Sequence, residues 1–139
     1  MWIRIREGAT VKCLNKVMVI GYVGRDPEMR YLPSGKPVTS FSVGATRSWT
    51  SSEGEHREET EWFNVVAWGN LAEICKQYLS KGRHVYVEGR LQTRSWEDQE
   101  GKKHFRTELV AREVIMLDSP REALGVDEAT DVGEEAFPF

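Results

Sequence analysis

The 139-residue sequence has few of the groups that metal sites and disulfide frameworks require. Its two cysteines, Cys13 and Cys75, form no CxxC pair, and its three histidines are scattered along the chain. A structural zinc site needs about four ligands, usually in two closely spaced pairs, so no metal site is predicted. Free thiols in a reducing compartment are the simpler interpretation, and we expect no cofactor.

Long hydrophobic runs are missing too. No apolar run approaches the roughly 20 residues that span a bilayer, so we expect no membrane association. Residues 1–13 begin with a charged stretch interrupted by Glu7, which lacks the continuous apolar segment of a secretory signal. We therefore expect an irregular N-terminal leader over residues 1–13 and a cytoplasmic protein.

Groups arranged for catalysis are equally absent. The sequence shows no carboxylate cluster at metal-ligand spacing and no nucleophile with an evident base. An enzyme such as a nuclease is therefore a weak interpretation, and a non-enzymatic protein is expected.

Charge is distributed unevenly along the chain. The whole sequence has a net charge of −3, which argues against a nucleic-acid partner. Residues 1–117, however, hold 18 Lys and Arg against 15 Asp and Glu, whereas residues 118–139 hold one arginine and seven carboxylates. Such asymmetry indicates a mildly basic domain that carries an acidic tail.

Most of the chain before residue 118 is predicted to form β-strands separated by turns. Alternating or Val-rich stretches bounded by Gly, Pro, Asn and Asp predict strands at about residues 15–24, 37–49, 60–69, 83–96 and 103–117. Residues 50–56 are polar and are expected to form a long exposed loop, and residues 97–101 are expected to form a hairpin loop.

One helix is predicted between the third and fourth of these strands. An apolar face repeats at the i, i+3, i+4, i+7, i+8 spacing through Leu71, Ile74, Cys75, Tyr78 and Leu79. Asn70 is placed to cap the N-terminus, with Glu73 completing a capping box, and Gly82 is expected to supply a left-handed stop.

This order of elements predicts an all-β fold: an OB-fold, a five-stranded Greek-key barrel with one short helix between strands 3 and 4. We place it at residues 14–117. Aromatic and β-branched residues almost vanish after Leu117 until the last three positions, so residues 118–139 are expected to be a disordered acidic tail.

Alternation in the third predicted strand separates two faces. Phe63, Val65 and Ala67 form an apolar inward face, because successive side chains of a strand point to opposite sides. Trp62 and Trp68 share the other face, six positions apart, or roughly 20 Å. A single tryptophan is more often part of a core, but Trp62, Trp68 and Trp96 together, on polar faces of adjacent elements, favour an exposed binding surface.

The fourth predicted strand repeats this division. Arg94 and Trp96 lie on its polar face, away from Val85 and Val87. Rings interleaved with guanidinium groups suit single-stranded nucleic acid, whose bases stack at roughly 1–3 kcal/mol each. Trp49 shares parity with inward-facing residues of the second strand, so alternation alone leaves its position open.

Basic residues along the predicted barrel are candidates for phosphate contacts, although any one of them taken alone is more simply a solvated surface charge. The candidates are Lys16, Arg30, Arg47, Arg57, Lys81, Arg94, Lys102, Lys103 and Arg106. Lys102 and Lys103 follow the hairpin loop and make the better cluster.

The C-terminus combines acidic charge, aromatic rings and a free carboxylate, in Glu134, Glu135, Phe137, Pro138 and Phe139. Exposed aromatics on an acidic, disordered segment indicate a short peptide that partner proteins dock, with the ring in a pocket and the carboxylate near basic groups.

Several blocks in a fixed order now give the chain a family resemblance. They are Asn15-Lys16-Val17, Gly24-Arg25-Asp26-Pro27-Glu28, Arg30-Tyr31, Thr60-Glu61-Trp62, Leu71-Ala72-Glu73, Tyr78-Leu79-Ser80-Lys81-Gly82, Val85-Tyr86-Val87-Glu88-Gly89 and Thr93-Arg94-Ser95-Trp96. Over residues 14–117, and again at Pro138-Phe139, the sequence resembles the bacterial single-stranded DNA-binding protein family.

The resemblance implies that Trp49, Trp62, Trp68 and Trp96 are the base-stacking aromatics, and so it assigns Trp49 a role that parity left open. It also implies a homotetramer, a bacterial nucleoid-associated location, no catalysis, and a tail tip that docks replication, recombination and repair proteins. Trp68 stands where many members carry Phe, and the tip lacks the usual run of aspartates.

Two hypotheses follow. The first is sequence-independent binding and protection of single-stranded DNA during replication, recombination and repair, with recruitment of partner enzymes through the tip. The second is an OB-fold adaptor that acts mainly in protein assembly, with the barrel surface as an interface.

Overall fold

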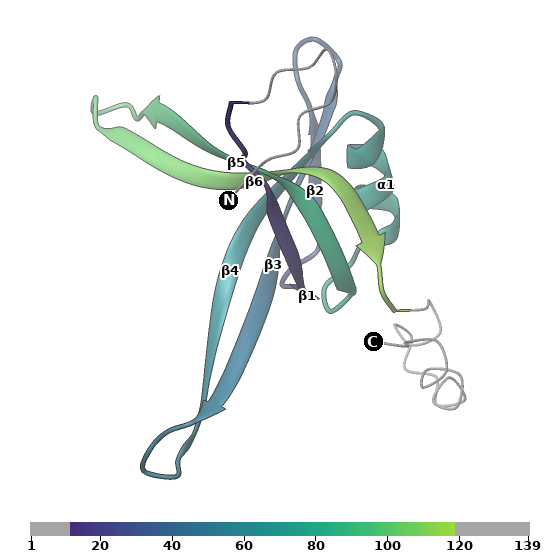
Figure 1. The fold of residues 1–139 in the computed structure, drawn as a ribbon. Helices are drawn as coiled ribbons and strands as arrows, with labels where there is room; N and C mark the ends of the chain where they lie inside the picture. Colours follow the sequence, from purple (N-terminus) through teal and green to yellow (C-terminus); the bar gives the residue numbers. More distant parts are fainter. Residues whose placement is uncertain (1–11, 119–139) are drawn as a thin grey trace.

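A computed structural model describes residues 12–118 (Figure 1). These residues form six strands and one helix: β1 (Val17–Val23), β2 (Glu28–Tyr31), β3 (Pro37–Thr50), β4 (His56–Trp68), α1 (Asn70–Tyr78), β5 (His84–Glu97) and β6 (Lys103–Met116). Residues 1–11 of the predicted leader (1–13) and residues 119–139 of the predicted tail (118–139) lie outside the described part of the chain, so their predicted structure stays a prediction.

Five of the strands close into a barrel. Hydrogen-bonded neighbours run β1-β5-β6-β4-β3, and β3 pairs again with β1 through Tyr22↔Gly44 and Val23↔Val43. The β4–β6 pairing is parallel, and the other pairings are antiparallel. A closed five-stranded all-β barrel is consistent with the predicted OB-fold.

The predicted strand count and helix position need correction. The short strand β2 was not predicted, and it pairs with β3 outside the closed ring. The helix therefore lies between β4 and β5 rather than between strands 3 and 4. Four mainly exposed residues beside a Pro-Ser-Gly turn carry too weak an alternation to be recognised as a strand.

Alternating burial explains how the strands enclose one core. Along β1 every second side chain is buried, and in β4 Val65 and Ala67 are buried while Trp62 and Trp68 are exposed, as predicted. The core contains Val19, Val23, Phe41, Val43, Val65, Ala67, Ala72, Cys75, Leu79, Val85, Val87 and Leu109. β-Branched residues dominate it because they fit a pleated surface that is buried on one side.

The helix packs against β3 and β4 with a face slightly different from the predicted one. Ala72 and Cys75 are buried, whereas Ile74 and Tyr78 are exposed. Burial raises the pKa of the Cys75 thiol to about 11, so this thiol stays neutral. The thiol is thus a packing group of the core.

The predicted helix ends were also wrong. Gly69, with φ of 64°, is the N-cap, and no side chain caps the helix, so Asn70 and Glu73 do not form a capping box. At the other end Leu79 is extended, and Gly82 takes its positive φ in the turn that follows. Leu79 is nevertheless buried in the core.

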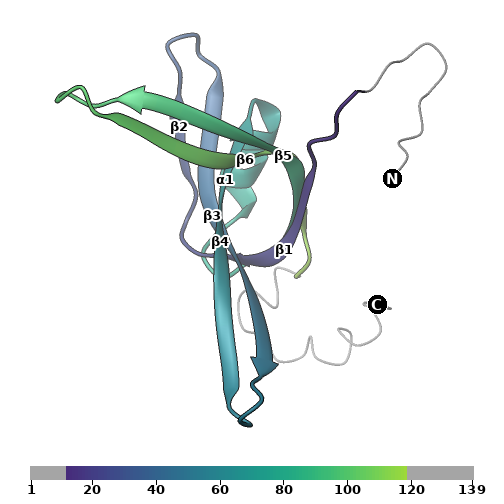
Figure 2. The same cartoon turned by 60° about the vertical axis from the view of Figure 1, so that its left-hand side comes forward.

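Two hairpins extend beyond the barrel (Figures 1 and 2). The β3–β4 arm ends in a turn over residues 51–55, which confirms the predicted loop at 50–56 except for one strand residue at each end. The β5–β6 arm ends in the predicted turn, where the backbone N–H of Gly101 donates to the carbonyl of Asp98 at 3.0 Å. Within residues 12–118 no helix is long and apolar enough to cross a membrane.

Candidate nucleic-acid interface

Two grooves on the outside of the barrel hold three of the four predicted stacking tryptophans. The Trp62–Trp96 groove has a volume of about 610 Å³ and is lined by Gly24, Arg25, Ser42, Trp62, Asn64, Trp96, Phe105 and Arg106. The Trp68 groove has a volume of about 330 Å³ and is lined by Arg25, Glu28, Met29, Arg30, Val38, Ser40, Val66, Trp68, Gln92, Arg94, Arg106, Glu108 and Val110. Arg25 and Arg106 line both grooves, so the two grooves adjoin each other.

All four predicted stacking tryptophans are partly open to solvent. The exposed fractions are 58% for Trp62, 42% for Trp96, 38% for Trp68 and 36% for Trp49. None of the four rings belongs to the buried core.

Two glycines leave room for the Trp62 ring against the barrel. A Cβ atom at Gly24 would lie 2.5 Å from Cζ3 of the Trp62 ring, and one at Gly44 would lie 2.8 Å from it. Contacts this short do not occur, so only glycine lets the ring lie flat against the backbone at the β1–β3 junction. One side of the indole ring lies against Gly24 and Gly44, and Trp62 remains more than half exposed.

Trp96 lies on the β5–β6 arm between charged and aromatic neighbours. His104, its cross-strand partner, stacks on it with ring centroids 5.6 Å apart, and Cζ of Arg94 lies 5.2 Å from the ring centroid. His104 is itself fixed by a 2.8 Å contact between its Nε2 and Oδ2 of Asp98. These contacts orient a ring that would otherwise turn freely on a hairpin.

Trp68 ends β4 at the rim of the second groove. The ammonium group of Lys36 lies 5.7 Å from its ring centroid, and Val38 and Val66 are buried in the groove floor. A ring with a cation beside it and an apolar floor below offers both stacking and charge.

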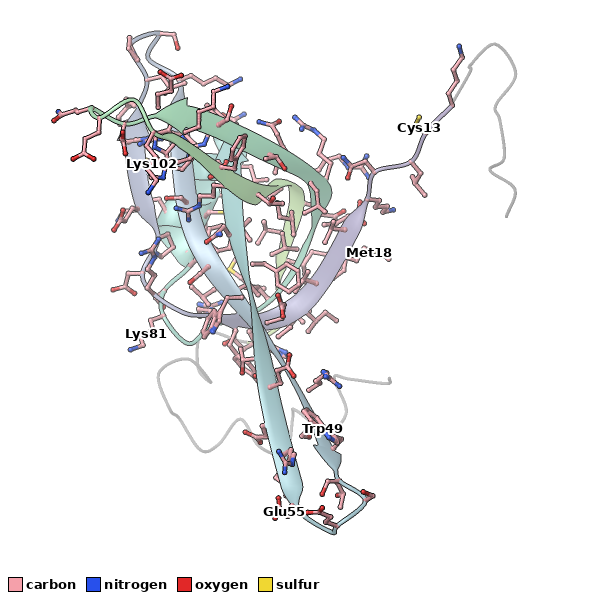
Figure 3. All side chains as sticks on the ribbon, turned by 90° about the vertical axis from the view of Figure 1, so that its left-hand side faces the viewer. Cys13, Met18, Trp49, Glu55, Lys81 and Lys102 are labelled. Atoms are coloured by element: carbon pink, nitrogen blue, oxygen red, sulfur yellow. The ribbon has the colours of Figure 1, made fainter. Side chains whose placement is uncertain are left out.

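Trp49 lies on the other arm, away from both grooves (Figure 3). It points to the same side of β3 as the buried Phe41 and Val43, as alternation required, but β3 has by then passed the barrel rim. Its ring is therefore exposed, with Cζ of Arg47 at 4.4 Å from the ring centroid.

Three of the predicted phosphate-binding residues line the Trp68 groove: Arg30, Arg94 and Arg106. Lys102 and Lys103 lie at the end of the β5–β6 arm that carries Trp96, and Figure 3 shows Lys102 at this end. The structure thus brings five of the nine predicted residues to the grooves or to the neighbouring arm.

The other four predicted residues lie elsewhere. Arg47 and Arg57 are on the β3–β4 arm, paired with Glu59 at 3.3 Å and Glu55 at 2.9 Å. Lys81 follows α1 in a turn and lines neither groove. Lys16 lies 3.6 Å from Glu88 on a different face of the barrel.

Sequence analysis missed several residues in or beside the grooves, among them two cations and one aromatic residue. Arg25 lines both grooves, Phe105 lines the Trp62–Trp96 groove and is exposed, and Lys36 approaches Trp68. Arg25 and Lys36 lie in turns, where strand alternation does not predict which way a side chain points. The run from Lys102 to Arg106, basic with one aromatic, was the signal that could have identified Phe105.

A separate face of the barrel is apolar and lies on β1, β5 and β6. Met18 and Ile20 of β1 are exposed and stand opposite Glu88 and Tyr86 of β5, with Ile115 of β6 beyond. Figure 3 shows Met18 on the outside of β1. Single exposed apolar residues are normal, but a contiguous group indicates an interaction surface.

Glu88 is the buried charge on this second face. The Tyr86 hydroxyl donates to it at 2.8 Å and Arg112 donates at 2.6 Å, with Lys16 close by. The hydrogen bond from Tyr86, followed by that from Arg112, lowers the pKa of Glu88 below its ordinary value. The same hydrogen bond raises the pKa of Tyr86.

The predicted docking residues, from Glu134 to Phe139, lie outside the described residues. The docking role of the tail therefore stays a prediction.

Comparison with known proteins identifies the family. The model of the "Single-strand binding protein family" matches residues 14–117, which is most of the chain. The chain belongs to the single-strand binding protein family. One family relative, named single-stranded DNA-binding protein 1, from Chlorobaculum tepidum, is 48% identical over 118 residues, covering 84% of this chain and 73% of the relative.

A solved structure is similar to the barrel as well. It is described as a Plasmodium falciparum SSB complex with ssDNA, and it matches with a TM-score of 0.70 and 34% identity over 79% of this chain and all of that one. Both sequence and fold therefore agree with the resemblance to this family that the motifs indicated.

Proposed function

We propose that this protein binds single-stranded DNA independently of sequence and protects it during replication, recombination and repair. The main observation behind the proposal is the pair of adjoining grooves, in which the exposed rings of Trp62, Trp96 and Trp68 lie beside arginines. Membership of the single-strand binding protein family and the similarity to a complex with ssDNA support it.

The chemistry of the surface fits a flexible strand. Bases stack on indole rings whatever their identity, because every base has a π-face, and this contributes roughly 1–3 kcal/mol per base. Arg25, Arg30 and Arg94 supply cations along the grooves. Duplex DNA keeps its bases stacked inside, so it offers nothing to these rings.

Titration of a labelled oligo-dT, followed by fluorescence anisotropy, tests the proposal. Trp62→Ala and Trp96→Ala are expected to weaken binding about five- to a hundredfold, by the loss of one stacked base each. Tyr78→Ala is the matched control, because Tyr78 is an exposed ring on α1 that lines neither groove. Wild-type protein that does not bind oligo-dT would refute the proposal and favour the adaptor hypothesis.

Homotetramer formation is part of the proposal. Met18, Ile20 and Ile115 leave apolar surface exposed on one face of β1 and β6, away from the tryptophan grooves. Burial of such a face stabilises by about 25 cal/mol per Å² of apolar surface. We expect the mass of a tetramer in solution and a lower mass for Met18→Lys combined with Ile20→Lys. A wild-type monomer would refute this assignment.

Partner recruitment through the tail tip, the absence of catalysis and a cytoplasmic, nucleoid-associated location complete the proposal. The acidic, aromatic composition of residues 134–139 supports docking by proteins with a basic, ring-accepting pocket. Deletion of these six residues is expected to leave oligo-dT binding intact while binding to replication and repair enzymes is abolished. Oligo-dT incubated with the protein and magnesium is expected to stay uncut.

A further inference from the structure

A polar cluster, made of Arg94, Arg106 and the buried Glu108, lies between the stacking tryptophans. Arg94 and Arg106 are direct cross-strand partners in the β5–β6 ladder, an arrangement in which two like charges repel. Glu108 lies beside both: its Oε2 is 3.3 Å from Nη2 of Arg94 and 3.8 Å from Nε of Arg106. With only 8% of its surface exposed, Glu108 is a buried carboxylate inside a groove that we propose binds DNA.

Arg106 keeps unused hydrogen-bonding capacity at this point. Its Nη2 donates to Oδ1 of Asn64 at 2.9 Å. Its Nε is buried, and no acceptor within residues 12–118 reaches it. A buried donor without a partner costs roughly 1–3 kcal/mol. The Arg106 side chain as a whole is 39% exposed, so a ligand in the groove can still accept from the outer part of the guanidinium.

The cluster lies on the path between two stacking rings. Trp62 and Trp68 are six positions apart on one face of β4, or roughly 20 Å, and Asn64 lies between them. Glu108 precedes Leu109, which pairs with Val65 in the parallel β4–β6 ladder, so the carboxylate comes from the middle of this path. Stacked bases are only about 3.4 Å apart, so a strand that contacts both rings must pass other nucleotides over the cluster.

The charges of the cluster favour a base edge over a phosphate at this point. A phosphate beside Glu108 would face a carboxylate that already lies close to both arginines. A nucleobase edge instead offers adjacent donor and acceptor atoms. Glutamate accepts from the exocyclic amine of cytosine, and arginine donates to neighbouring acceptors.

We propose that Glu108 and Arg106 form a base-reading subsite that prefers a base with an exocyclic amine, such as cytosine, over thymine at one nucleotide position. The carboxylate of Glu108 accepts from the amine, and the guanidinium of Arg106 donates to the adjacent ring nitrogen. This rests on the proposed binding of single strands, and it adds a modest base preference to sequence-independent affinity.

Glu108→Gln tests the subsite with oligo-dC and oligo-dT of equal length in the same anisotropy assay. Loss of the carboxylate is expected to weaken oligo-dC binding about fivefold relative to oligo-dT. Glu28→Gln is the matched control, because Glu28 lines the same groove but is exposed, and the variant removes the same charge. If Glu108→Gln shifts both oligonucleotides equally, as a pure change of charge would, the subsite is refuted.

A second measurement does not depend on how the variant folds. Wild-type protein is titrated with oligo-dC in which cytosine carries an N4,N4-dimethylated amine, which has no N–H to donate. About fivefold weaker binding than to oligo-dC is expected for the wild type, and no such difference for Glu108→Ala, which has no acceptor for the amine. Equal wild-type affinity for both oligonucleotides overturns the subsite. Because oligo-dT has no such amine, its binding tests the proposed function separately.

Discussion

The two hairpin arms carry the same kind of aromatic platform on backgrounds of opposite charge. Trp49 and Trp96 each have an arginine against the ring, at 4.4 and 5.2 Å. Residues 45–61 of the β3–β4 arm, however, hold two arginines and five glutamates, whereas residues 90–107 of the β5–β6 arm hold five Lys and Arg and three Asp and Glu. Figure 2 shows the two arms leaving the barrel in different directions.

The difference in charge between the arms separates two contributions to binding that usually occur together, base stacking and electrostatic attraction of phosphates. Arg47 and Arg57 on the acidic arm are paired with glutamates of that arm, so little of their charge is left for phosphates. A stacking ring works without net positive charge, but attraction of the DNA backbone does not. We therefore expect the β5–β6 arm to bind more tightly and with stronger salt dependence.

The sharpest test compares one tryptophan from each arm. Trp96→Ala is expected to weaken oligo-dT binding about five- to a hundredfold, and Trp49→Ala by about threefold, because the acidic arm holds its nucleotides less closely. Anisotropy titration at one salt concentration measures both. Equal losses in the two variants would mean that the charge of the arms does not matter.

A smaller effect is expected from the basic residues at the end of the β5–β6 arm. Lys102→Gln combined with Lys103→Gln should reduce the slope of log K against log salt by about 0.7 for each phosphate that these lysines neutralise in the wild type. Arg47→Gln combined with Arg57→Gln removes the same charge from the other arm. We expect its slope to match that of the wild type, and a decrease as large as that of the lysine variant would contradict the comparison.

Removing acid from the β3–β4 arm should have the opposite effect. Glu58, Glu59 and Glu61 are exposed and repel phosphates near Trp49. Their joint change to Gln is expected to tighten oligo-dT binding about two- to threefold at low salt, and the gain should fade as salt screens the arm. Titrations at two salt concentrations measure this, and a gain that persists in high salt would rule out screening.

The smallest effect concerns the turn of the β5–β6 arm. The hydrogen bond with His104, followed by that from the Lys102 amide, lowers the pKa of Asp98 from its ordinary value of 3.8. A lowered pKa in the folded state stabilises the turn above the ordinary value, and this stabilisation is lost as pH falls through the lowered one. In Asp98→Asn, the amides of Glu100 and Lys102 should exchange with solvent faster than in the wild type at pH 7.

In strong acid, where Asp98 is protonated, the amides of Glu100 and Lys102 should exchange as fast in the wild type as in Asp98→Asn. Exchange in the β3–β4 turn serves as the control, since Asp98 makes no contact there. Unchanged exchange of both amides in Asp98→Asn at pH 7 would show that the carboxylate does not hold the turn.

Sequence alone was sufficient where alternation or composition is strong. The long strands, the buried Cys75 and the outward Trp62 and Trp68 follow from side-chain periodicity, and the structure confirms them. Periodicity reports only which face a residue occupies, however. It left Trp49 open because whether an inward side chain is buried depends on where the barrel ends.

Features that depend on distant pairing were beyond prediction. Strand β2 exists because β3 continues past the ring and offers it a partner. Arg25 reaches both grooves from a turn, and the cluster of Arg94, Arg106 and Glu108 needs the β5–β6 register. None of these contacts leaves a local pattern in the sequence.

The closure between β1 and β3 has a consequence for stability. Only Tyr22↔Gly44 and Val23↔Val43 join these strands, and the Trp62 ring lies over Gly44 beside this junction. A base that stacks on Trp62 therefore covers one of the two barrel junctions that only two residue pairs close. A ligand bound only by the folded state stabilises that state by RT ln(1 + [L]/Kd). Binding of single-stranded DNA is therefore expected to stabilise the barrel against unfolding.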